Sequence, residues 1–313
     1  MYLIVQIPCY NEEKSILKVV NSIPKKLKGI KKIDILIIDD GSSDNTHKII
    51  NSRVKKDFYI RLPENKGLAN AFKIGINKCL EKKADLIVNF DGDNQYKASD
   101  IQSLIDPIII DNYDFTIGER RFKNIKTFSF IKKFLQIFGS LVVSKIVKFN
   151  VKDATSGFRA YNRKAASKIF VYNNFTYTIE SLMHFSNTKL SFKGIPIDVN
   201  QKERESRLFK SNLEYIFKTF CIILRVFFLK NPFKLMTFLS IIFLVPGLYL
   251  CIKWINLWFL NLYDFNLTPS LLLGTMLITL SILSLAIALL CYYQSVNKNL
   301  QEEIISILKT NGS

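Results

Sequence analysis

The sequence predicts an α/β domain with a mostly parallel sheet, followed by amphipathic helices and two membrane-spanning helices. Three observations predict this class. Short apolar runs alternate with helical patterns over residues 1–119, as is typical of a parallel sheet with helices on both faces. Polar clusters follow three of these runs, and two long uncharged stretches lie after residue 234.

The expected strands are the short apolar runs, at residues 3–8, 33–38, 58–61, 85–90 and 115–117. Apolar spacing predicts a helix from about Glu12 to Ser22. Asp44 is expected to cap the next helix. A third helix should open near residue 67, with one face formed by Leu68, Ala71, Phe72 and Gly75.

The polar clusters at residues 10–13, 39–43 and 91–95 each follow an expected strand. Parallel strands end at one edge of a sheet, and ligands bind outside that edge. Asp91 and Asp93, with Gly92 between them, could both turn toward one point there. Mg²⁺ binds through one or two carboxylates together with substrate phosphates. The alternative is an ordinary acidic turn, since Asp-Gly and Asp-Asn are common in turns.

Four motifs together resemble those of family 2 glycosyltransferases, which have the GT-A fold. They are Pro-Cys-Tyr-Asn-Glu-Glu at residues 8–13, Asp-Asp-Gly-Ser-Ser-Asp at 39–44, Asn-Lys-Gly at 65–67 and Asp-Gly-Asp at 91–93. The resemblance implies a Rossmann-like GT-A domain and a metal, Mg²⁺ or Mn²⁺, held by Asp91, Asp93 and Gln95. It also implies a nucleotide site formed by Pro8, Tyr10, Glu12, Asp39, Asp40, Lys66, Asp91 and Gly92.

Later segments are similar to polyprenyl-phosphate sugar transferases, the group of dolichyl-phosphate mannosyltransferase and bacterial undecaprenyl-phosphate glucosyltransferases. They are Gly-Glu-Arg-Arg at residues 118–121, Asp-Ala-Thr-Ser-Gly-Phe-Arg at 153–159 and Arg-Glu-Ser-Arg at 204–207. The third lacks a glycine of the related pattern and has Arg207 in place of lysine. The resemblance implies an acceptor-phosphate site formed by Arg120, Arg159, Arg204, Ser206 and Arg207.

Catalysis is accordingly expected from Asp91, Asp93, Arg120 and Asp153. A phosphate monoester has a second pKa of ~6, so the acceptor oxygen is already nucleophilic at neutral pH. Such an acceptor needs positioning more than a general base, and no base is assigned. Asp153 is the candidate for a supporting carboxylate, which either takes part in catalysis or orients an arginine.

The C-terminal third explains a mean hydropathy of +0.15, which is high for a soluble protein. Residues 235–252, with Pro246-Gly247 as an expected kink, and residues 271–293 carry no formal charge. Each is long enough to cross a ~30 Å hydrocarbon layer. Two Phe-rich basic segments precede them, at residues 127–149 and 213–230. Such segments suit a membrane interface, and core packing is the alternative.

The expected organisation is a glycosyltransferase domain over residues 1–210, a juxtamembrane helix over 211–231 and a two-span region over 232–313. Residues 120–234 carry 23 Lys and Arg against 6 Asp and Glu, a net charge of +17, just before the first span. Positive charge stays on the cytoplasmic side. We therefore expect an integral membrane protein with a cytoplasmic catalytic domain and both termini cytoplasmic. No signal peptide is expected, because Met1 leads directly into a strand.

The predicted function is transfer of a sugar, with inversion, from a nucleotide-diphosphate sugar to a membrane polyprenyl phosphate. One alternative is a transferase with a hydroxyl acceptor on a polysaccharide or glycolipid. Another is a non-catalytic nucleotide-sugar-binding protein, against which the intact Asp-x-Asp motif argues. The expected partners are the nucleotide sugar, the lipid and the membrane, with no nucleic acid and with a homo-oligomer left open. The five cysteines form no Cys-x-x-Cys pair and indicate free thiols rather than a zinc site.

Overall fold

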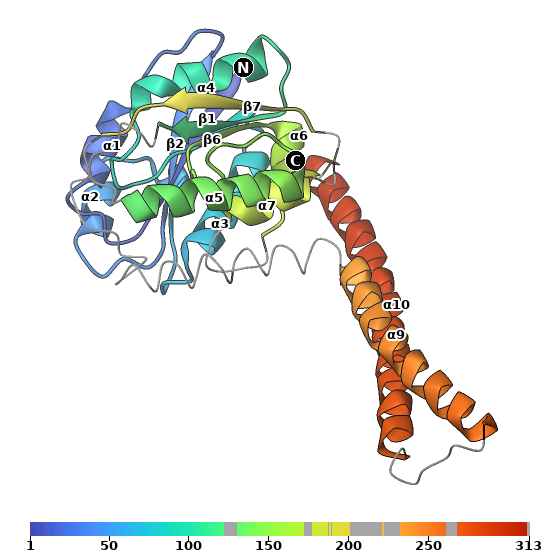
Figure 1. Ribbon diagram of the computed structural model, residues 1–313. Helices are drawn as coiled ribbons and strands as arrows, with labels where there is room; N and C mark the ends of the chain where they lie inside the picture. The colour runs from blue at the N-terminus through green and yellow to red at the C-terminus, as the bar shows by residue number, and fades with distance from the viewer. Residues whose placement is uncertain are drawn as a thin grey trace. The chain divides into compact units, whose positions relative to one another are not determined.

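The computed structural model of the 313-residue chain describes residues 1–121, 130–171, 177–186, 188, 190–200, 221, 232–260 and 268–311. The chain divides into two compact units, shown as ribbons in Figure 1. The first unit comprises Met1–Val226 and Glu302–Ser313, and the second comprises Phe227–Gln301.

A seven-stranded sheet forms the centre of the first unit, in the order β3-β2-β1-β4-β6-β5-β7. Within this sheet, β6 is the one strand that runs antiparallel to its neighbours, β4 and β5. The mostly parallel sheet expected from the sequence is therefore confirmed. The strands are β1 (Tyr2–Cys9), β2 (Lys32–Asp39), β3 (Tyr59–Arg61), β4 (Leu86–Asn89), β5 (Phe115–Arg120), β6 (Arg159–Asn162) and β7 (Phe192–Ile197).

Helices cover both faces of the sheet (Figure 1). Because side chains alternate across a strand, Leu3 and Val5 of β1 enter one apolar core while Ile4 enters the other. The first core is completed by α1 (Ile16–Ser22), α2 (Thr46–Asn51) and α4 (Ile101–Ile109). The second is completed by α3 (Leu68–Glu81), α5 (Phe130–Val147), α6 (Arg163–Ser167) and α7 (Thr178–Ser186). Two short 3₁₀ helices, η1 (Lys56–Phe58) and η2 (Ala98–Asp100), complete the described elements of this unit.

Several boundaries differ from expectation. Helix α1 begins at Ile16 rather than near Glu12, because the Glu12 carbonyl accepts from the backbone N–H groups of Ser15 and Ile16 in a tight turn. The N-cap residue of α2 is Asn45, and Asp44 instead accepts a hydrogen bond from Thr46 N at 2.9 Å.

The expected apolar face of α3 is wrong at Leu68, which is 38% exposed in the first turn; the other three predicted positions are buried. Strand β5 is longer than predicted and reaches Arg120.

Helix α5 lies within the basic segment predicted at residues 127–149 and presents apolar side chains outward. Phe138 and Leu141 are 51% and 56% exposed, whereas Gln136 and Ser140 are buried. Their burial follows from hydrogen bonds, since Ser140 Oγ accepts from Ala154 N and Gln136 donates to Thr155. The second basic segment, at residues 213–230, lies outside the described residues except for Cys221.

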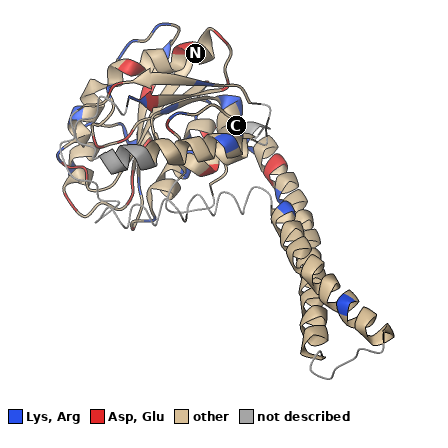
Figure 2. Cartoon of the chain, in the orientation of Figure 1, with Lys and Arg blue, Asp and Glu red and all other residues tan. Residues whose placement is uncertain are grey.

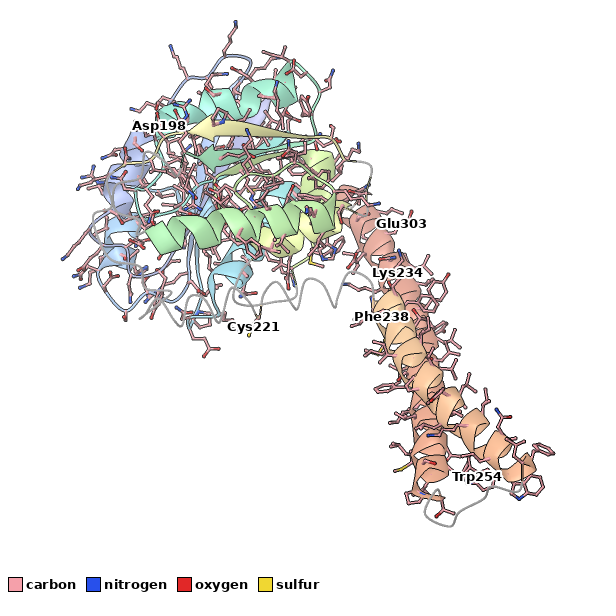
Figure 3. All side chains as sticks on the ribbon, in the orientation of Figure 1. Asp198, Cys221, Lys234, Phe238, Trp254 and Glu303 are labelled. Carbon is pink, nitrogen blue, oxygen red and sulfur yellow. The ribbon has the colours of Figure 1, made fainter. Side chains whose placement is uncertain are left out.

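The second unit contains α9 (Pro232–Phe259) and most of α10 (Thr268–Asn311). Both helices contain 18-residue windows with mean hydropathy 2.3 and are long and apolar enough to cross a membrane. Charged residues are sparse along both (Figure 2), and Figure 3 shows Phe238, which is 61% exposed, on α9. The spans are longer than the uncharged stretches that predicted them, and α9 continues through Pro246.

Small residues hold the two helices of this second unit close together. A β-carbon on Gly247 would lie 3.1 Å from Gly274 O, and one on Gly274 would lie 3.1 Å from Gly247 O. The hydroxyls of Ser240 and Ser281 are 2.9 Å apart. Small residues and serine bonds at a crossing are typical of helix pairs in lipid, where backbones must approach closely to gain packing energy.

Candidate active site

The loops that follow β1 and β2 are tied together at one edge of the sheet. Asn11, in the left-handed region with φ 56°, accepts at Oδ1 from Ser43 N at 2.8 Å and from Asp44 N at 3.4 Å. Its own N–H donates to Ser42 Oγ at 2.9 Å. Because β1 and β2 are parallel and in register from Tyr2 to Cys9, both polar clusters lie at their common carboxyl edge, which we call the donor edge.

The two adjacent aspartates after β2 have different surroundings. Asp39 is fully buried and accepts from Ser42 N and from the Tyr59 hydroxyl, each at 2.9 Å. Asp40 accepts from Lys66 N and Gly67 N, each at 2.9 Å, and so holds the loop before α3 at the donor edge. Both aspartates were predicted to bind nucleotide. The hydrogen bonds of Asp39 join the end of β2 to the loop that follows it and to β3.

Glu12 and Gly92 bring the first motif beside the fourth. Ser15 Oγ lies 2.7 Å from Glu12 Oε2 and 2.8 Å from Gly92 O. A β-carbon on Gly92 would lie 3.1 Å from Cys9 Cβ, so a larger residue there would require Cys9, at the end of β1, to shift by a few tenths of an ångström. Of the other predicted nucleotide-binding residues, Pro8 lies buried in β1, Tyr10 is half-buried just after it and the Lys66 side chain is half-exposed.

Asp91 and Asp93 follow β4 at the same edge. Asp93 accepts from Gln95 N at 3.1 Å and from Gln95 Nε2 at 2.7 Å, so the three predicted metal ligands belong to one turn. Asp91 Oδ1 is buried and has no hydrogen-bond partner among the residues that the structure describes. Burial, and then the charge of Asp93, raise the pKa of Asp91 to about 7, against the opposing charge of Arg120.

This donor set fits a divalent cation bound together with a diphosphate. A buried, unpartnered carboxylate oxygen is costly unless a cation or donor meets it. Mg²⁺ needs only one or two carboxylates when phosphates supply other ligands. No group of three or more His, Cys, Asp or Glu side chains placed to hold a metal is found in the described ranges, so diphosphate oxygens would have to complete the coordination.

Arg120 and Asp153 form a bidentate ion pair. Arg120 Nε donates to Asp153 Oδ2 at 2.6 Å, and Nη2 donates to Asp153 Oδ1 at 3.0 Å and to Thr155 Oγ1 at 2.9 Å. Asp153 is fully buried and the Arg120 side chain is 11% exposed. The pKa of Arg120 is raised, because the attraction of Asp153 outweighs the cost of burial. Of the two roles left open for Asp153, the geometry favours orienting this arginine.

Arg159 has a different environment from Arg120. Its guanidinium is fully buried and donates to Ser156 O, Thr178 O, Ser181 Oγ and Ala154 O, at 2.8 to 2.9 Å. These bonds hold the loop between α5 and β6 against α7. The remaining predicted acceptor-phosphate residues, Arg204, Ser206 and Arg207, lie outside the described residues.

Three buried polar residues near Asp91 were missed from the sequence. Asn89, at the end of β4, donates to Gly157 O and to the Tyr177 hydroxyl, each at 2.8 Å. It also accepts from Gln6 Nε2 at 2.9 Å. The available signal was an asparagine or glutamine inside an otherwise apolar strand, since buried polar side chains need partners.

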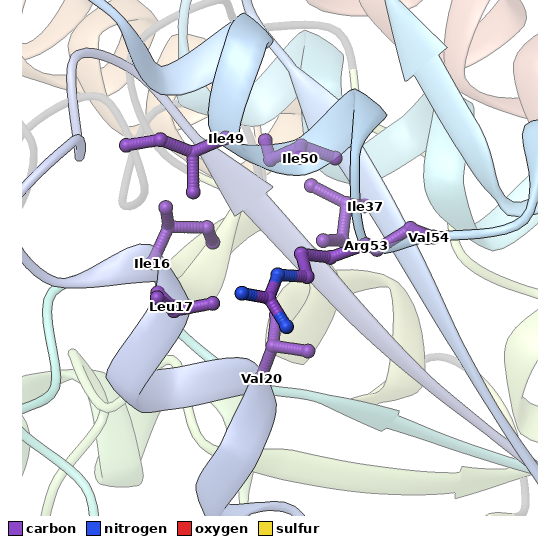
Figure 4. A pocket seen from close by; sticks show the side chains of 8 residues that line it. All are labelled: Ile16, Leu17, Val20, Ile37, Ile49, Ile50, Arg53 and Val54. Carbon is purple, nitrogen blue, oxygen red and sulfur yellow. The ribbon is translucent and has the colours of Figure 1, made fainter.

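A small hollow elsewhere is not a candidate site. It lies between α1 and α2 above β2 and is lined by seven aliphatic side chains and Arg53 (Figure 4). None of its lining residues is a carboxylate or belongs to the predicted site.

The family model for glycosyl transferase family 2 matches residues 4–170, more than half of the chain. The chain therefore belongs to glycosyltransferase family 2. The resemblance expected from the four motifs is confirmed, and so is the assignment of the protein to the transferases.

Three relatives are named as sugar transferases that use dolichyl phosphate or undecaprenyl phosphate. The chain is 34% identical over 218 residues to a UDP-N-acetylglucosamine–dolichyl-phosphate N-acetylglucosaminyltransferase of Methanococcus voltae, covering 63% of this chain and 84% of that protein. It is 28% identical to a dolichyl-phosphate β-glucosyltransferase of Dictyostelium discoideum, covering 54% and 57%. It is 25% identical to an undecaprenyl-phosphate mannosyltransferase of Micrococcus luteus, covering 66% and 85%.

Solved structures share the fold. Glucosyl-3-phosphoglycerate synthase from Mycobacterium tuberculosis, in complex with Mn²⁺, UDP and glucosyl-3-phosphoglycerate, matches with TM-score 0.54 and 16% identity, covering 72% of this chain and 78% of that one. The same enzyme with Mg²⁺ and UDP matches with TM-score 0.51 and 15% identity, covering 71% and 78%. At this identity the likeness shows the fold alone.

Proposed function

We propose that this protein transfers a sugar from a nucleotide-diphosphate sugar to a membrane polyprenyl phosphate, with inversion at the anomeric carbon. The observation that carries the proposal is the donor edge. There, Asp91 and Asp93 lie in a family 2 domain, and one buried Asp91 oxygen has no partner among the described residues. The chain also has two helices long and apolar enough to cross a membrane. The relatives that act on dolichyl or undecaprenyl phosphate support this choice of acceptor.

On the donor side, Asp91 and Asp93, with Gln95, would hold Mg²⁺ or Mn²⁺ together with the donor diphosphate. Such a cation, when bound, neutralises the charge of the leaving diphosphate. Asp40 keeps the Lys66 backbone at the donor edge through its two backbone hydrogen bonds. Pro8, Tyr10, Glu12 and Gly92 are proposed to line the remainder of the nucleotide site.

On the acceptor side, Arg120 is the proposed contact to the lipid phosphate within the described part of the domain. Asp153 fixes the guanidinium plane through two parallel hydrogen bonds, the geometry that makes arginine a directional phosphate ligand. Arg204, Ser206 and Arg207 are proposed to complete the phosphate site. Arg159 would act indirectly, because its hydrogen bonds position the loop that carries Asp153.

The proposed topology has two spans, with the catalytic unit and both termini in the cytoplasm. The end of α10 supports it, since Glu302–Ser313 belongs to the same unit as the sheet. His184 Nδ1 of α7 lies 3.2 Å from Glu302 Oε2, and Lys309 Nζ donates to Ile169 O at 3.4 Å. A chain end that packs on the catalytic unit must lie on the same side of the membrane. The exposed Phe138 and Leu141 of α5 are proposed to enter the lipid interface.

The test of the function is a product assay. Membranes containing the protein are incubated with a polyprenyl phosphate and each of a panel of radiolabelled nucleotide sugars. The lipid is then extracted, and its mass is measured by mass spectrometry. We expect one sugar to give a lipid heavier by a single glycosyl unit, linked through phosphate and cleaved by mild acid. Label found only on a hydroxyl of a glycan or glycolipid would establish the other transferase class. Binding of a nucleotide sugar without any transfer would contradict both.

A further inference from the structure

A buried hydrogen-bonded network lies directly behind Asp91. It begins at Gln6 on β1, whose Nε2 donates to Asn89 Oδ1 at 2.9 Å. Asn89 Nδ2 in turn donates to Gly157 O and to the Tyr177 hydroxyl, each at 2.8 Å. Gln6 and Asn89 are fully buried, and Tyr177 is 1% exposed. The network thus joins two strands, the loop before β6 and the residue that precedes α7.

Gly157 is the part of this network that touches Asp91. A β-carbon built on Gly157 would lie 2.9 and 3.0 Å from Asp91 Oδ2 and Oδ1, and 2.7 Å from the Tyr177 hydroxyl. The Gly157 backbone therefore lies directly beside the Asp91 carboxylate, and there is no room for a side chain between them.

The Gly157 backbone is held by hydrogen bonds at both its carbonyl and its N–H group. The carbonyl of Gly157 accepts from Asn89, and its N–H donates to the Tyr96 hydroxyl at 3.1 Å. The Tyr177 ring is stacked on Phe72 with centroids 3.8 Å apart and planes within 8°. Tyr96 is in turn stacked on Phe158, with ring centroids 5.1 Å apart. These contacts together limit the movement of the Gly157 backbone.

Folding alone does not account for this network. An aliphatic residue at position 89 would fill the sheet without requiring amide partners, as its β4 neighbours Ile87 and Val88 do. The network is also imperfect, since Gln6 Oε1 has no partner in the part of the chain that is described. A polar group retained in a core at such a cost is commonly found where a functional group must be positioned.

We propose that Asn89 and Tyr177 are positioning residues for Asp91. They hold the Gly157 backbone against its carboxylate and so set the orientation of the oxygens that face the cation and the donor diphosphate. The inference rests on the proposed function, because it needs Asp91 to act as a ligand.

The experiment measures cation binding separately from turnover. Full-length protein in detergent is titrated with Mn²⁺ in the presence of UDP, and free Mn²⁺ is followed by electron paramagnetic resonance. The Tm of each variant is recorded in parallel, without metal. Gly157→Ala should weaken Mn²⁺ binding at least about tenfold, because its β-carbon displaces Asp91. Tyr177→Phe should weaken it about three- to tenfold, because the Tyr177 hydroxyl accepts from Asn89 Nδ2 and donates to Gly157 O at 3.4 Å, and both bonds are lost.

A double variant separates the two steric contacts of the new methyl group. Tyr177→Phe combined with Gly157→Ala removes the hydroxyl at 2.7 Å, so part of the lost Tm should return, while Mn²⁺ binding should stay weak because the clash with Asp91 remains. Gly29→Ala is the matched control. Gly29 has φ +81°, so alanine there is strained, but it lies before β2, at the opposite edge of the sheet, and Mn²⁺ affinity should be unchanged.

Three outcomes would overturn the inference. Wild-type Mn²⁺ affinity in Tyr177→Phe would show that the hydroxyl positions nothing, and this variant stays informative if Gly157→Ala does not fold. Recovery of Mn²⁺ binding in the double variant would place the effect at Tyr177 rather than at Asp91. A loss of affinity in Gly29→Ala equal to that in Tyr177→Phe would show a general effect of stability. If the wild type binds no Mn²⁺ with UDP, the proposed metal site fails as well, which distinguishes that failure from the first three.

Discussion

The two compact units differ in the side chains that they expose. In the catalytic unit, large apolar side chains such as Leu3 and Ile4 are fully buried, and charged ones such as Asp153 are buried only with partners within the unit. In the hairpin of α9 and α10, large apolar side chains such as Tyr249 and Leu272 are more than 60% exposed. The proposed placement of the second unit in the membrane accounts for this difference, because each unit turns outward what its surroundings accept.

Tight packing also serves different purposes in the two units. At the donor edge, close backbone approaches at Gly157 and Gly92 leave room for carboxylates and hydrogen bonds. In the hairpin, the close approach of Gly247 and Gly274 brings backbone against backbone, and the other atoms nearest to the two glycines belong to uncharged residues. The first arrangement creates binding chemistry, and the second creates a stable helix pair. Substitutions at the donor edge should therefore affect binding and transfer, whereas substitutions in the hairpin should affect the packing of the helix pair.

The largest effect is expected from Asp93→Asn at the donor edge. It keeps an oxygen that can accept from Gln95 but removes the negative charge offered to a cation. We expect the rate of transfer to fall about a hundred- to a thousandfold, the usual cost of losing one preorganised electrostatic group. The rate of lipid glycosylation is the measurement, and Asp57→Asn on η1 is the exposed carboxylate control. Full turnover in the presence of EDTA would refute the metal assignment.

An intermediate effect is expected from Arg204 and Arg207, which are proposed to complete the acceptor-phosphate site. Arg204→Ala or Arg207→Ala should lower kcat/KM for polyprenyl phosphate about ten- to a hundredfold, because a charge-assisted contact contributes roughly 1.5–3 kcal/mol. The KM for the nucleotide sugar should change much less. Arg207→Lys should keep much of the activity, since either cation can bind a phosphate.

These predictions are checked by measuring the initial rate of transfer while the concentrations of polyprenyl phosphate and of nucleotide sugar are each varied. Equal harm to both substrates, together with a lower Tm, would indicate a structural role for these arginines. Normal turnover of polyprenyl phosphate by the alanine variants would remove them from the acceptor site.

Much of this organisation could be predicted from the sequence, because local patterns report local structure. Alternating apolar runs predicted the five strands β1 to β5, and the motif order predicted the family. The predicted start of the first helix at Glu12 was wrong, because Asn11 at positive φ and the Glu12 carbonyl form a turn before the helix begins at Ile16. Tertiary hydrogen bonds to Ser42 and Ser43 hold that turn, and no local pattern shows them.

The residues that the sequence did not reveal depend on contacts between distant parts of the chain. Asn89 and Tyr177 are 88 residues apart, and they meet only because β6 returns antiparallel between β4 and β5. Arg159 was assigned to the acceptor-phosphate site because residues 153–159 resemble a segment of polyprenyl-phosphate sugar transferases. Its burial follows from the packing of α7, whose Thr178 and Ser181 accept its hydrogen bonds. Residue type predicted the chemistry, and only the fold shows where each charge is directed.

The smallest effect on activity is expected from changes to the hairpin loop and the C-terminus, which instead test topology. In a background lacking the five native cysteines, single cysteines replace Asn261 or Ser313, and intact cells are treated with a membrane-impermeant maleimide. Asn261→Cys should react, since it lies between the two spans, whereas Ser313→Cys should react only after the membrane is opened. Asp57→Cys in the catalytic unit should behave like Ser313→Cys. Labelling of Ser313→Cys but not of Asn261→Cys in intact cells would reverse the topology. It would show that the +17 charge of residues 120–234 does not set the orientation.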